Sequence, residues 1–394
     1  MTILAIFLIN QIRTGGDRRY LELMELLAEK GNKVFVIMNK YLDYNPKYIN
    51  KIQIPVKYVL HHFPPASYLF KKSIKKHLNE IINSIGGISS IDFINIHGDI
   101  YLKSAILIKK RFKKPFFYAY RCNDIDRDRI TRSSGELSIS KYLFSLLYEN
   151  INRYREKQIA SYAEIITFQS TNERDAFCSR TNSSLSKTII IPGNIGLPRC
   201  TKEYENKNNS KSVKNILFTG GFSINKGVLF LPPVFSELKK RGFGFLKCTI
   251  LGRGEPSKFL ETMKKYDVSD MFNLLGYSDP FPYLITNDLF LYPAIYDAYP
   301  DAILEALHVG CPVLSSSVGG MIDMLQYPEL LFEPQNIKEI SNKIEQCIVD
   351  PSFYMYMKEL CAKRATFHHF DWAEQFEKAM SDYLSKNHST YKDT

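Results

Sequence analysis

The chain has 394 residues, 45% of them hydrophobic, and 52 basic against 41 acidic side chains give a formal net charge of +11. This length and apolar content suffice for two sizeable cores and exclude a fibrous or disordered protein. The positive balance indicates anionic partners, namely nucleic acid, phosphorylated ligands or an anionic membrane face.

The seven cysteines are scattered and form no Cys-x-x-Cys pair, which favours reduced thiols over a disulfide framework or a zinc site. The first ten residues are apolar but lack a basic start and a cleavage motif, so they predict a β-strand rather than a signal peptide. No window reaches about 18 consecutive apolar residues, so we expect no transmembrane helix. These features predict a cytoplasmic protein.

The chain is expected to begin with a strand, a glycine turn and a helix. Residues 3–9 form a continuous apolar run, which is typical of a buried parallel strand. Gly15 and Gly16 follow, and Asp17 is expected to cap the helix. Glycines at a helix start let backbone amides approach an anion, whereas the alternative is a plain tight turn. The spacing is not Gly-x-Gly-x-x-Gly, so no dinucleotide fingerprint is met.

A basic amphipathic helix is predicted within residues 61–80. Its apolar residues fall at helical spacing beside a group of lysines: Leu69, Phe70, Ile74 and Leu78, with Lys71, Lys72, Lys75 and Lys76. Such a helix is a candidate for lying on anionic lipid. The alternative is a solvated helix that packs on its own domain.

Two more strands are expected at residues 91–96 and 115–120, and polar residues follow each of them. His97 ends the first strand, in the place where open α/β sheets bind ligands. A purely structural histidine is the alternative. Residues 125–138 are rich in charge, Ser and Gly, and they predict a mobile loop.

The rest of the first half continues the α/β alternation, with a long helix, a strand, a short helix and a last strand at 139–160, 162–170, 173–180 and 188–191. Residues 199–214 are polar and predict a linker. The expected domains are therefore residues 1–198 and residues 215–369.

The second half restarts with a strand at residues 216–219 and a glycine-rich loop that holds Gly221 and Lys226. A lysine in such a loop between strand and helix is typical of phosphate binding, whereas the alternative is a solvated surface lysine. Arg253 follows the next expected strand and is a second candidate cation.

Residues 296–323 carry the most informative pattern. Asp297 precedes a short helix that Pro300 opens, and Glu305 lies about two turns inside it. Gly310 is expected to end this helix with a positive φ. The two carboxylates can address opposite ends of one ligand. The alternative is a surface helix with ordinary charges.

This stretch resembles the signature of retaining family 4 glycosyltransferases of the GT-B fold. That signature is an acid, seven residues, Glu, Gly-Cys-Pro-Val and a Gly-Gly loop, here D-AYPDAIL-E at 297–305, GCPV at 310–313 and GG at 319–320. The resemblance spans nearly the whole chain and is strongest from 216 to 325. It implies two Rossmann-like domains whose parallel sheets face across a cleft, with residues 370–394 returning to the first domain.

The resemblance also implies a metal-independent retaining transferase that moves a sugar from a nucleotide-diphosphate sugar and needs no cofactor. Asp297, His97 and Lys226 are the implied catalytic residues, and Glu305 is expected to hold the ribose. The donor-binding set further includes Gly15, Gly16, Gly221, Arg253, Tyr277, Ala298, Tyr299, Pro300, Gly319 and Gly320. Two positions depart from the family: Asp297 replaces Glu, and Gly221 replaces an arginine whose charge Arg253 is expected to supply.

Family habit and the basic first half indicate a glycan or lipid-linked acceptor in polysaccharide or glycolipid synthesis, with peripheral association at the inner face of the cell membrane. One rival interpretation is a GT-B epimerase or hydrolase that acts on the nucleotide sugar alone. Another is a basic α/β protein that binds nucleic acid, but the sequence holds no recognised nucleic-acid motif, so no nucleic-acid partner is expected.

Overall fold

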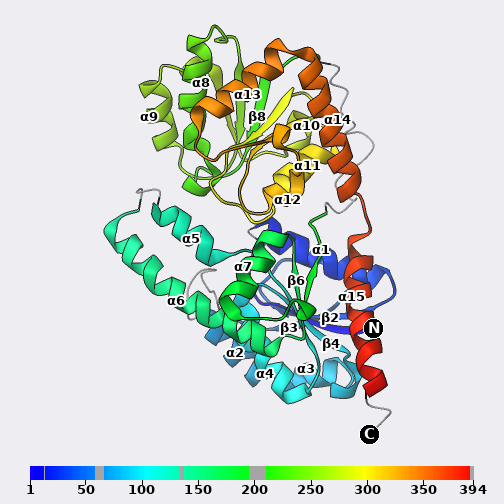
Figure 1. The fold of residues 1–394 in the computed structure, drawn as a ribbon. Helices are drawn as coiled ribbons and strands as arrows, with labels where there is room; N and C mark the ends of the chain where they lie inside the picture. Colours follow the sequence, from blue (N-terminus) through cyan, green and yellow to red (C-terminus); the bar gives the residue numbers. More distant parts are fainter. Residues whose placement is uncertain (13, 58–65, 134–136, 195–209, 391–394) are drawn as a thin grey trace.

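The computed structural model describes residues 1–12, 14–57, 66–133, 137–194 and 210–390. Two lobes lie one above the other, and each is built around its own parallel sheet (Figure 1). Each sheet also has its own buried hydrophobic cluster. The expected linker at 199–214 lies outside the described residues up to position 209.

The first sheet has seven parallel strands in the order β3-β2-β1-β4-β5-β6-β7. Its strands are β1 Thr2–Phe7, β2 Lys33–Asn39, β3 Asn50–Ile54, β4 Phe93–His97, β5 Phe116–Ala119, β6 Ile165–Phe168 and β7 Thr188–Ile190. The helices between them are α1 Gly15–Glu29, α2 Ala66–Lys76, α3 Leu78–Ser84, α4 Leu102–Phe112, α5 Asp124–Ser133, α6 Ile139–Tyr162 and α7 Thr171–Thr181. Apolar runs such as residues 3–7 are buried on both faces, as crossover helices require.

The second sheet has six parallel strands in the order β10-β9-β8-β11-β12-β13. Its strands are β8 Asn215–Thr219, β9 Lys247–Leu251, β10 Phe272–Gly276, β11 Leu289–Tyr292, β12 Val313–Ser316 and β13 Leu331–Phe332. Its helices are α8 Leu231–Lys240, α9 Ser257–Lys265, α10 Phe281–Leu284, α11 Asp301–His308, α12 Met321–Leu325, α13 Ile337–Val349 and α14 Pro351–His368. Both strand orders reverse at the first strand of the sheet, the topology that places ligands beyond the strands' carboxyl ends.

The last helix, α15 Trp372–Thr390, leaves the second lobe and lies against the first (Figure 1). Trp372, Phe376 and Met380 are buried in the first core, and the ring of Phe376 lies 5.7 Å from that of Phe117. Asn32 donates a hydrogen bond to Glu377 at 2.9 Å. The chain therefore covers the first sheet with its own C-terminal segment.

Three local predictions were wrong. Thr14 is the N-cap of α1, and Asp17 instead completes a capping box by accepting from the Thr14 amide. The expected loop at 125–138 is largely helical, because α5 spans Asp124–Ser133. Pro300 is the N-cap residue of α11 and has an extended ψ of 124°, so the helix itself begins one residue later, at Asp301.

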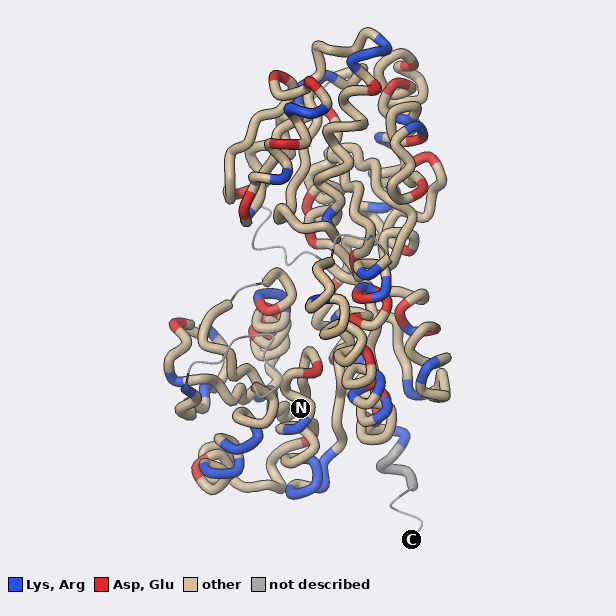
Figure 2. The backbone as a smooth tube through the Cα atoms, turned by 90° about the vertical axis from the view of Figure 1, so that its left-hand side faces the viewer, with Lys and Arg blue, Asp and Glu red and all other residues tan. Residues whose placement is uncertain are grey.

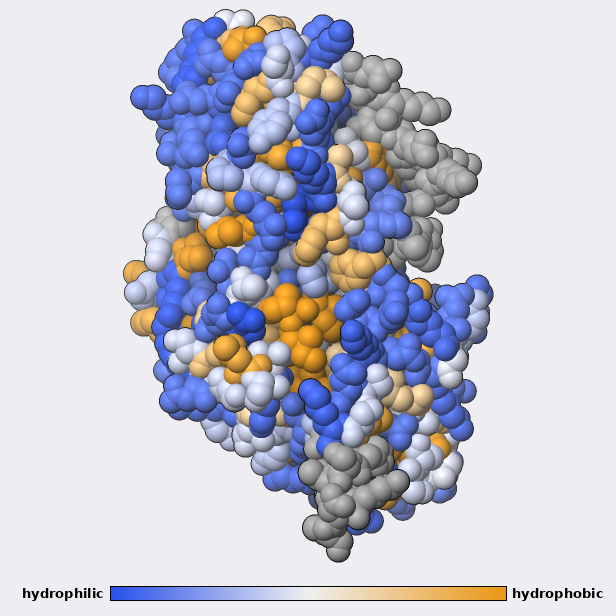
Figure 3. All heavy atoms as spheres, turned by 45° about the vertical axis from the view of Figure 1, so that its right-hand side comes forward, coloured by the Kyte–Doolittle hydropathy of each residue, from blue (hydrophilic) through white to orange (hydrophobic). Residues whose placement is uncertain are grey.

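Helix α2 packs on its own domain, because Phe70 and Ile74 are fully buried. Its lysines are exposed or half-buried, and Lys and Arg also gather at the lower end of the first lobe (Figure 2). On another face, an apolar patch lies on the lower lobe just beneath the junction, within a largely hydrophilic surface (Figure 3).

Candidate active site

The two lobes meet through loops that follow the strands' carboxyl ends. Thr171, at the start of α7, donates its amide and hydroxyl to Asp323 of α12 at 2.5 and 2.8 Å. The hydroxyl of Thr131 in α5 donates to the Asn225 side chain at 2.7 Å. Because these loops carry most of the predicted site residues, the junction itself is the candidate site.

A cluster of three side chains lies at the centre of this junction. The Nζ of Lys226 donates to the Tyr292 hydroxyl at 2.8 Å and lies 2.5 Å from Oδ2 of Asp297. The Tyr292 hydroxyl donates to the same Oδ2 at 2.7 Å. The structure thus brings together two predicted residues, and it adds Tyr292, which the sequence had indicated only as the end of a strand.

The cluster is charged at neutral pH. Burial lowers the pKa of Lys226, but the Asp297 carboxylate and the Tyr292 hydroxyl outweigh burial, so the pKa is raised above its usual 10.5. Burial raises the pKa of Asp297, but the ammonium group of Lys226 outweighs it, so this pKa is lowered. The Lys226 side chain remains 33% exposed, so a ligand in the junction can reach the ammonium group.

Three close glycine contacts hold the loops of this cluster in place. Gly227 has a φ of 68°, and a Cβ there would lie 1.8 Å from the Pro293 carbonyl oxygen. Gly319 and Gly320 press on the Asp297 loop in the same way, because their Cβ atoms would lie 2.1 and 1.7 Å from the carbonyl oxygens of Asp297 and Ala298. No side chain fits at these close approaches. The Gly320 amide also donates a hydrogen bond to the Asp297 carbonyl oxygen at 3.3 Å, so this amide already has a partner within the Asp297 loop.

The rest of the predicted donor set is divided between two places. Arg253 lies over the Tyr277 ring, 3.6 Å from its centroid, and both residues are exposed. Gly221 approaches the Arg253 carbonyl oxygen, to which the Phe222 amide donates at 3.0 Å. Tyr299, by contrast, is buried, with its hydroxyl 3.5 Å from Nδ1 of His368.

The N-terminus of α1 faces α11 across the junction. Arg19 forms an ion pair with Asp301, and Nη2 of Arg18 lies 3.7 Å from Oε1 of Glu305. A Cβ on Gly15 would lie 2.3 Å from the Asp301 carboxylate. An anion is thus already present at this helix N-terminus, where the macrodipole favours it. Sequence reasoning missed both arginines and Asp301, because nothing local to these residues signals that the two helices meet.

His97 and Arg121 extend the site into the first domain. The His97 ring lies edge-on to Tyr20 at 5.2 Å, and its Nδ1 has no hydrogen-bond partner among the described residues. Burial lowers the pKa of His97, and the positive charges of Arg121 and Arg19 lower it further, so the ring is neutral at pH 7. Nη1 of Arg121 contacts Asp17 at 3.1 Å, and Gly16 lies against the same guanidinium.

A cavity of about 250 Å³ opens in the first domain beyond the ends of β4 and β5. Its walls combine aromatic and charged side chains, including Tyr118, Tyr120, Tyr148, Arg121, Asn152 and Arg155. Cys122 is another wall residue, and Asp297 is among the charges that act on the pKa of its thiol. The cavity therefore lies within electrostatic reach of the Lys226 cluster.

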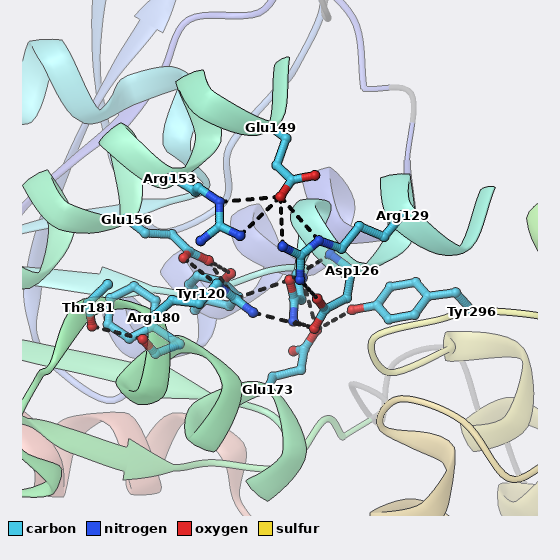
Figure 4. A network of polar contacts seen from close by, with 12 residues as sticks. Tyr120, Asp126, Arg129, Glu149, Arg153, Glu156, Glu173, Arg180, Thr181 and Tyr296 are labelled. Carbon is cyan, nitrogen blue, oxygen red and sulfur yellow. Dashed lines mark hydrogen bonds and ion pairs between the residues drawn. The ribbon is translucent and has the colours of Figure 1, made fainter. Parts of the chain in front are cut away.

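A polar network fixes the helices around this cavity (Figure 4). Glu149 of α6 accepts from Arg129 at 2.7 Å and Arg153 at 3.0 Å and also contacts Arg132; these bonds outweigh burial and lower its pKa to about 2. Glu173 of α7 accepts from the Asn123 amide and the Tyr296 hydroxyl, both at 3.1 Å. Burial raises the pKa of Glu173 to about 8. Tyr296 carries the network into the second domain, next to Asp297.

Across the described parts of the chain, no group of His, Cys, Asp and Glu could hold a metal ion. None of the described helices is long and apolar enough to cross a bilayer.

Residues 201–364 match the family model of glycosyl transferases group 1. This match covers less than half of the chain. The match contains Lys226, Tyr292, Asp297 and Glu305 and ends before α15. The candidate site is thus formed by the matched residues on one side and by the first half of the chain on the other.

Curated proteins and solved structures are also similar to this chain. The Staphylococcus aureus capsular polysaccharide biosynthesis glycosyltransferase CapH is 30% identical over 31% of this chain and 36% of its own length. Another curated relative is matched over only 44% of its length. The Escherichia coli lipopolysaccharide glucosyltransferase WaaG is 24% identical over 81% of both chains. The solved structure of sucrose-phosphate synthase from Thermosynechococcus elongatus superposes with a TM-score of 0.77 at 16% identity, over 98% of this chain and 99% of the other. The fold is GT-B.

Proposed function

We propose that the chain transfers a sugar, with retention of configuration and without a metal ion, from a nucleotide-diphosphate sugar to a hydroxyl group of a glycan acceptor. One observation carries the proposal: Lys226, Tyr292 and Asp297 form a charged, partly accessible cluster within the domain that matches the family. A diphosphate leaving group needs a positive charge that is already in position, and Lys226 is such a charge.

Donor binding is proposed to exchange partners within this cluster. The ammonium group of Lys226 turns from Asp297 to the diphosphate, whose higher charge gives the stronger interaction. Asp297 keeps its hydrogen bond from Tyr292 and becomes free to accept from hydroxyl groups of the donor sugar. Glu305, on the second turn of α11, accepts from the ribose hydroxyls, and Arg253 with Tyr277 offers a stacking surface for the base.

The proposed stereochemistry rests on the state of Asp297. In the donor complex its Oδ2 keeps the hydrogen bond from the Tyr292 hydroxyl, which is 2.7 Å long in the structure and lowers the nucleophilicity of this oxygen. A covalent glycosyl–enzyme intermediate through this atom is therefore disfavoured. We infer front-face transfer, in which the acceptor hydroxyl attacks from the side that the diphosphate leaves and gives its proton to a departing phosphate oxygen.

The cavity of the first domain is the proposed place for the acceptor. Its arginines are matched by acids: Arg155 contacts Asp99 at 2.5 Å, and Arg127 contacts Asp124 at 2.6 Å. Balanced donors and acceptors between tyrosine rings suit a neutral hydroxylated ring better than a phosphate. The names of CapH and WaaG fit a role in the synthesis of polysaccharide or lipid-linked glycan.

A panel of UDP-, GDP- and ADP-sugars in a thermal-shift assay tests the donor class. We expect one base to raise the melting temperature and Lys226→Ala to abolish this shift. The product formed with a sugar acceptor is then examined by NMR for its anomeric configuration. A product with inverted configuration would contradict the proposed retention. Release of free sugar that is equally fast with and without acceptor would contradict the proposed transfer.

A further inference from the structure

The first turn of α7 contacts the second domain at three consecutive residues. Its first residue contacts α12, and the Asn172 side chain donates a hydrogen bond to the Gly319 carbonyl oxygen at 3.1 Å. Glu173 accepts a hydrogen bond from the Tyr296 hydroxyl at 3.1 Å, and Figure 4 shows these two side chains pointing toward each other. Because Tyr296 directly precedes Asp297 in the chain, this turn holds the loop that carries the proposed donor-sugar residue.

Of these three contacts, the one between Glu173 and Tyr296 is buried. Glu173 is 2% exposed and Tyr296 7%, whereas Thr171 and Asn172 are exposed. Water competes for an exposed hydrogen bond, but a buried donor that loses its partner carries the full cost of desolvation. The bond between Glu173 and Tyr296 therefore fixes the position of the Tyr296 ring more firmly than the other two contacts can.

Glu173 also contacts the loop that forms part of the cavity wall. The Asn123 amide donates a hydrogen bond to the same Oε1 atom at 3.1 Å. Asn123 is 2% exposed and lies between Cys122 and Asp124, which both line the cavity. One carboxyl oxygen thus joins the cavity loop of the first domain to the Asp297 loop of the second.

The contact needs an acceptor oxygen and no negative charge. Both donors reach Oε1, and the Oε2 atom of Glu173 is buried without a hydrogen-bond partner among the described residues. Burial raises the pKa of Glu173 to about 8, and the charges of Asp297 and Asp124 act in the same direction, so the carboxyl group is mostly protonated at pH 7. A protonated carboxyl group and a side-chain amide have nearly the same shape, and each keeps an oxygen that accepts. Glutamine can therefore replace Glu173 in this contact, whereas alanine cannot.

We propose that Glu173 is a positioning residue, which through Tyr296 sets Asp297 at the distance from the cavity that transfer requires. The inference rests on the proposed function, in which Asp297 holds the donor sugar and the cavity holds the acceptor. The proposed contacts to the diphosphate and the ribose come from the second domain itself, so donor binding does not depend on this link. Loss of the link should instead misplace the donor sugar relative to the acceptor hydroxyl, and a shift of about 1 Å can lower the rate about 10²-fold.

The test compares sugar transfer and donor binding in variants that break the link. The donors are UDP-glucose, GDP-mannose and ADP-glucose, the acceptors are methyl glycosides of glucose, galactose and N-acetylglucosamine, and the variants are assayed with the pair that the wild type uses fastest. We expect Tyr296→Phe and Glu173→Ala each to lower kcat about 10- to 100-fold, and to leave the Kd of the nucleotide sugar in calorimetry at the wild-type value. Glu173→Gln should retain the wild-type kcat at pH 7. Because the two residues act through one hydrogen bond, Tyr296→Phe combined with Glu173→Ala should be no slower than the slower single variant.

Tyr354→Phe is the matched control for the loss of a buried hydroxyl group. Tyr354 is fully buried in the second domain, and its hydroxyl donates to the Asp288 carbonyl oxygen at 2.6 Å. Asp288 lies at the amino end of β11, away from the junction. The melting temperature of this variant should therefore fall like that of Tyr296→Phe, whereas its kcat should equal that of the wild type. A merely structural role of Tyr296 would make the two variants alike in kcat.

A wild-type kcat in Tyr296→Phe would overturn the inference. A Glu173→Gln variant as slow as Glu173→Ala would also overturn it, as would a Kd for the nucleotide sugar that rises in step with the loss of kcat. These outcomes leave the proposed function intact, because the wild type still transfers sugar. A wild type that transfers no sugar with any pair of donor and acceptor would contradict the proposed function, and the inference with it.

Discussion

Removal of the Lys226 ammonium group is the sharpest test of the candidate site. In Lys226→Ala the Asp297 carboxylate keeps only the Tyr292 hydroxyl of its two described side-chain partners. Loss of one member of a fully buried ion pair costs about 3–5 kcal/mol. Because the Lys226 side chain is 33% exposed, solvent offsets much of this cost, and we expect a loss of about 1–2 kcal/mol in the free energy of unfolding at pH 7.

The catalytic effect should be larger than the effect on stability. Loss of one preorganised charge that stabilises a leaving oxyanion costs about 2.7–4 kcal/mol. We therefore expect kcat to fall about 10²- to 10³-fold in steady-state assays, with the fold intact by circular dichroism. Asp297→Asn is the matched control for the pair: it removes the anionic partner, keeps the side chain's shape and leaves Lys226 free to bind the diphosphate.

The double variant separates the two roles of Lys226. If Lys226 only neutralises Asp297, Lys226→Ala combined with Asp297→Asn should turn over no more slowly than Asp297→Asn alone. If it holds the diphosphate, the double variant should lose a further 10²-fold or more, by the same electrostatic argument. A single Lys226→Ala variant that transfers sugar within about threefold of the wild-type rate would refute the leaving-group role.

Three further outcomes are expected. Glu305→Ala should weaken nucleotide-sugar binding about 10- to 100-fold in calorimetry, because hydrogen bonds to a charged group contribute ~1.5–3 kcal/mol; unchanged affinity would remove the ribose role. The pKa of Glu173 is about 8 in the folded protein, against an ordinary value of 4.5, so the folded state binds this proton more tightly and stability falls as the pH rises between these two values. Glu173→Gln should therefore reduce the fall of the melting temperature between pH 5 and 8. A fall equal to that of the wild type would contradict the raised pKa. Replacement of the four α2 lysines by glutamine should reduce binding to anionic vesicles, and the four are Lys71, Lys72, Lys75 and Lys76. Unchanged binding would favour a solvated helix.

The sequence predicted the site's members better than their contacts. Lys226 was expected near the donor because a glycine loop between strand and helix is a local pattern, and Asp297 because the stretch resembles the glycosyltransferase signature. Their ion pair was not predicted, since it depends on Gly227 pressing against Pro293, 66 residues further along the chain. The interdomain partners of Glu305 and Asp301 were missed for the same reason.

Helices α5 and α6 show the same limit in the fold. The composition of 125–138 predicted a loop, because the segment is rich in charge, Ser and Gly. In the structure, Arg129 and Arg132 of α5 contact Glu149 of α6, and these contacts link the two helices. A long helix was predicted at 139–160, and α6 spans Ile139–Tyr162. That the large apolar side chains of its first half are exposed became visible only once the neighbouring helices were placed.

Two positively charged sites of the junction, the Lys226 ammonium group and the N-terminus of α1, are each paired with a carboxylate of the second domain. Asp297 takes the Lys226 ammonium group, and Asp301 lies at the N-terminus of α1 beside Arg19. A diphosphate carries more charge than either carboxylate, so it can displace Asp297 from Lys226 without leaving a cation unpaired. Displacement of Asp301 would instead break a contact between the domains. We therefore expect donor binding at Lys226 alone to leave the domains together, whereas a phosphate that reaches Gly15 should separate α1 from α11. X-ray scattering in solution with and without nucleotide sugar distinguishes the two, since only the second changes the radius of gyration.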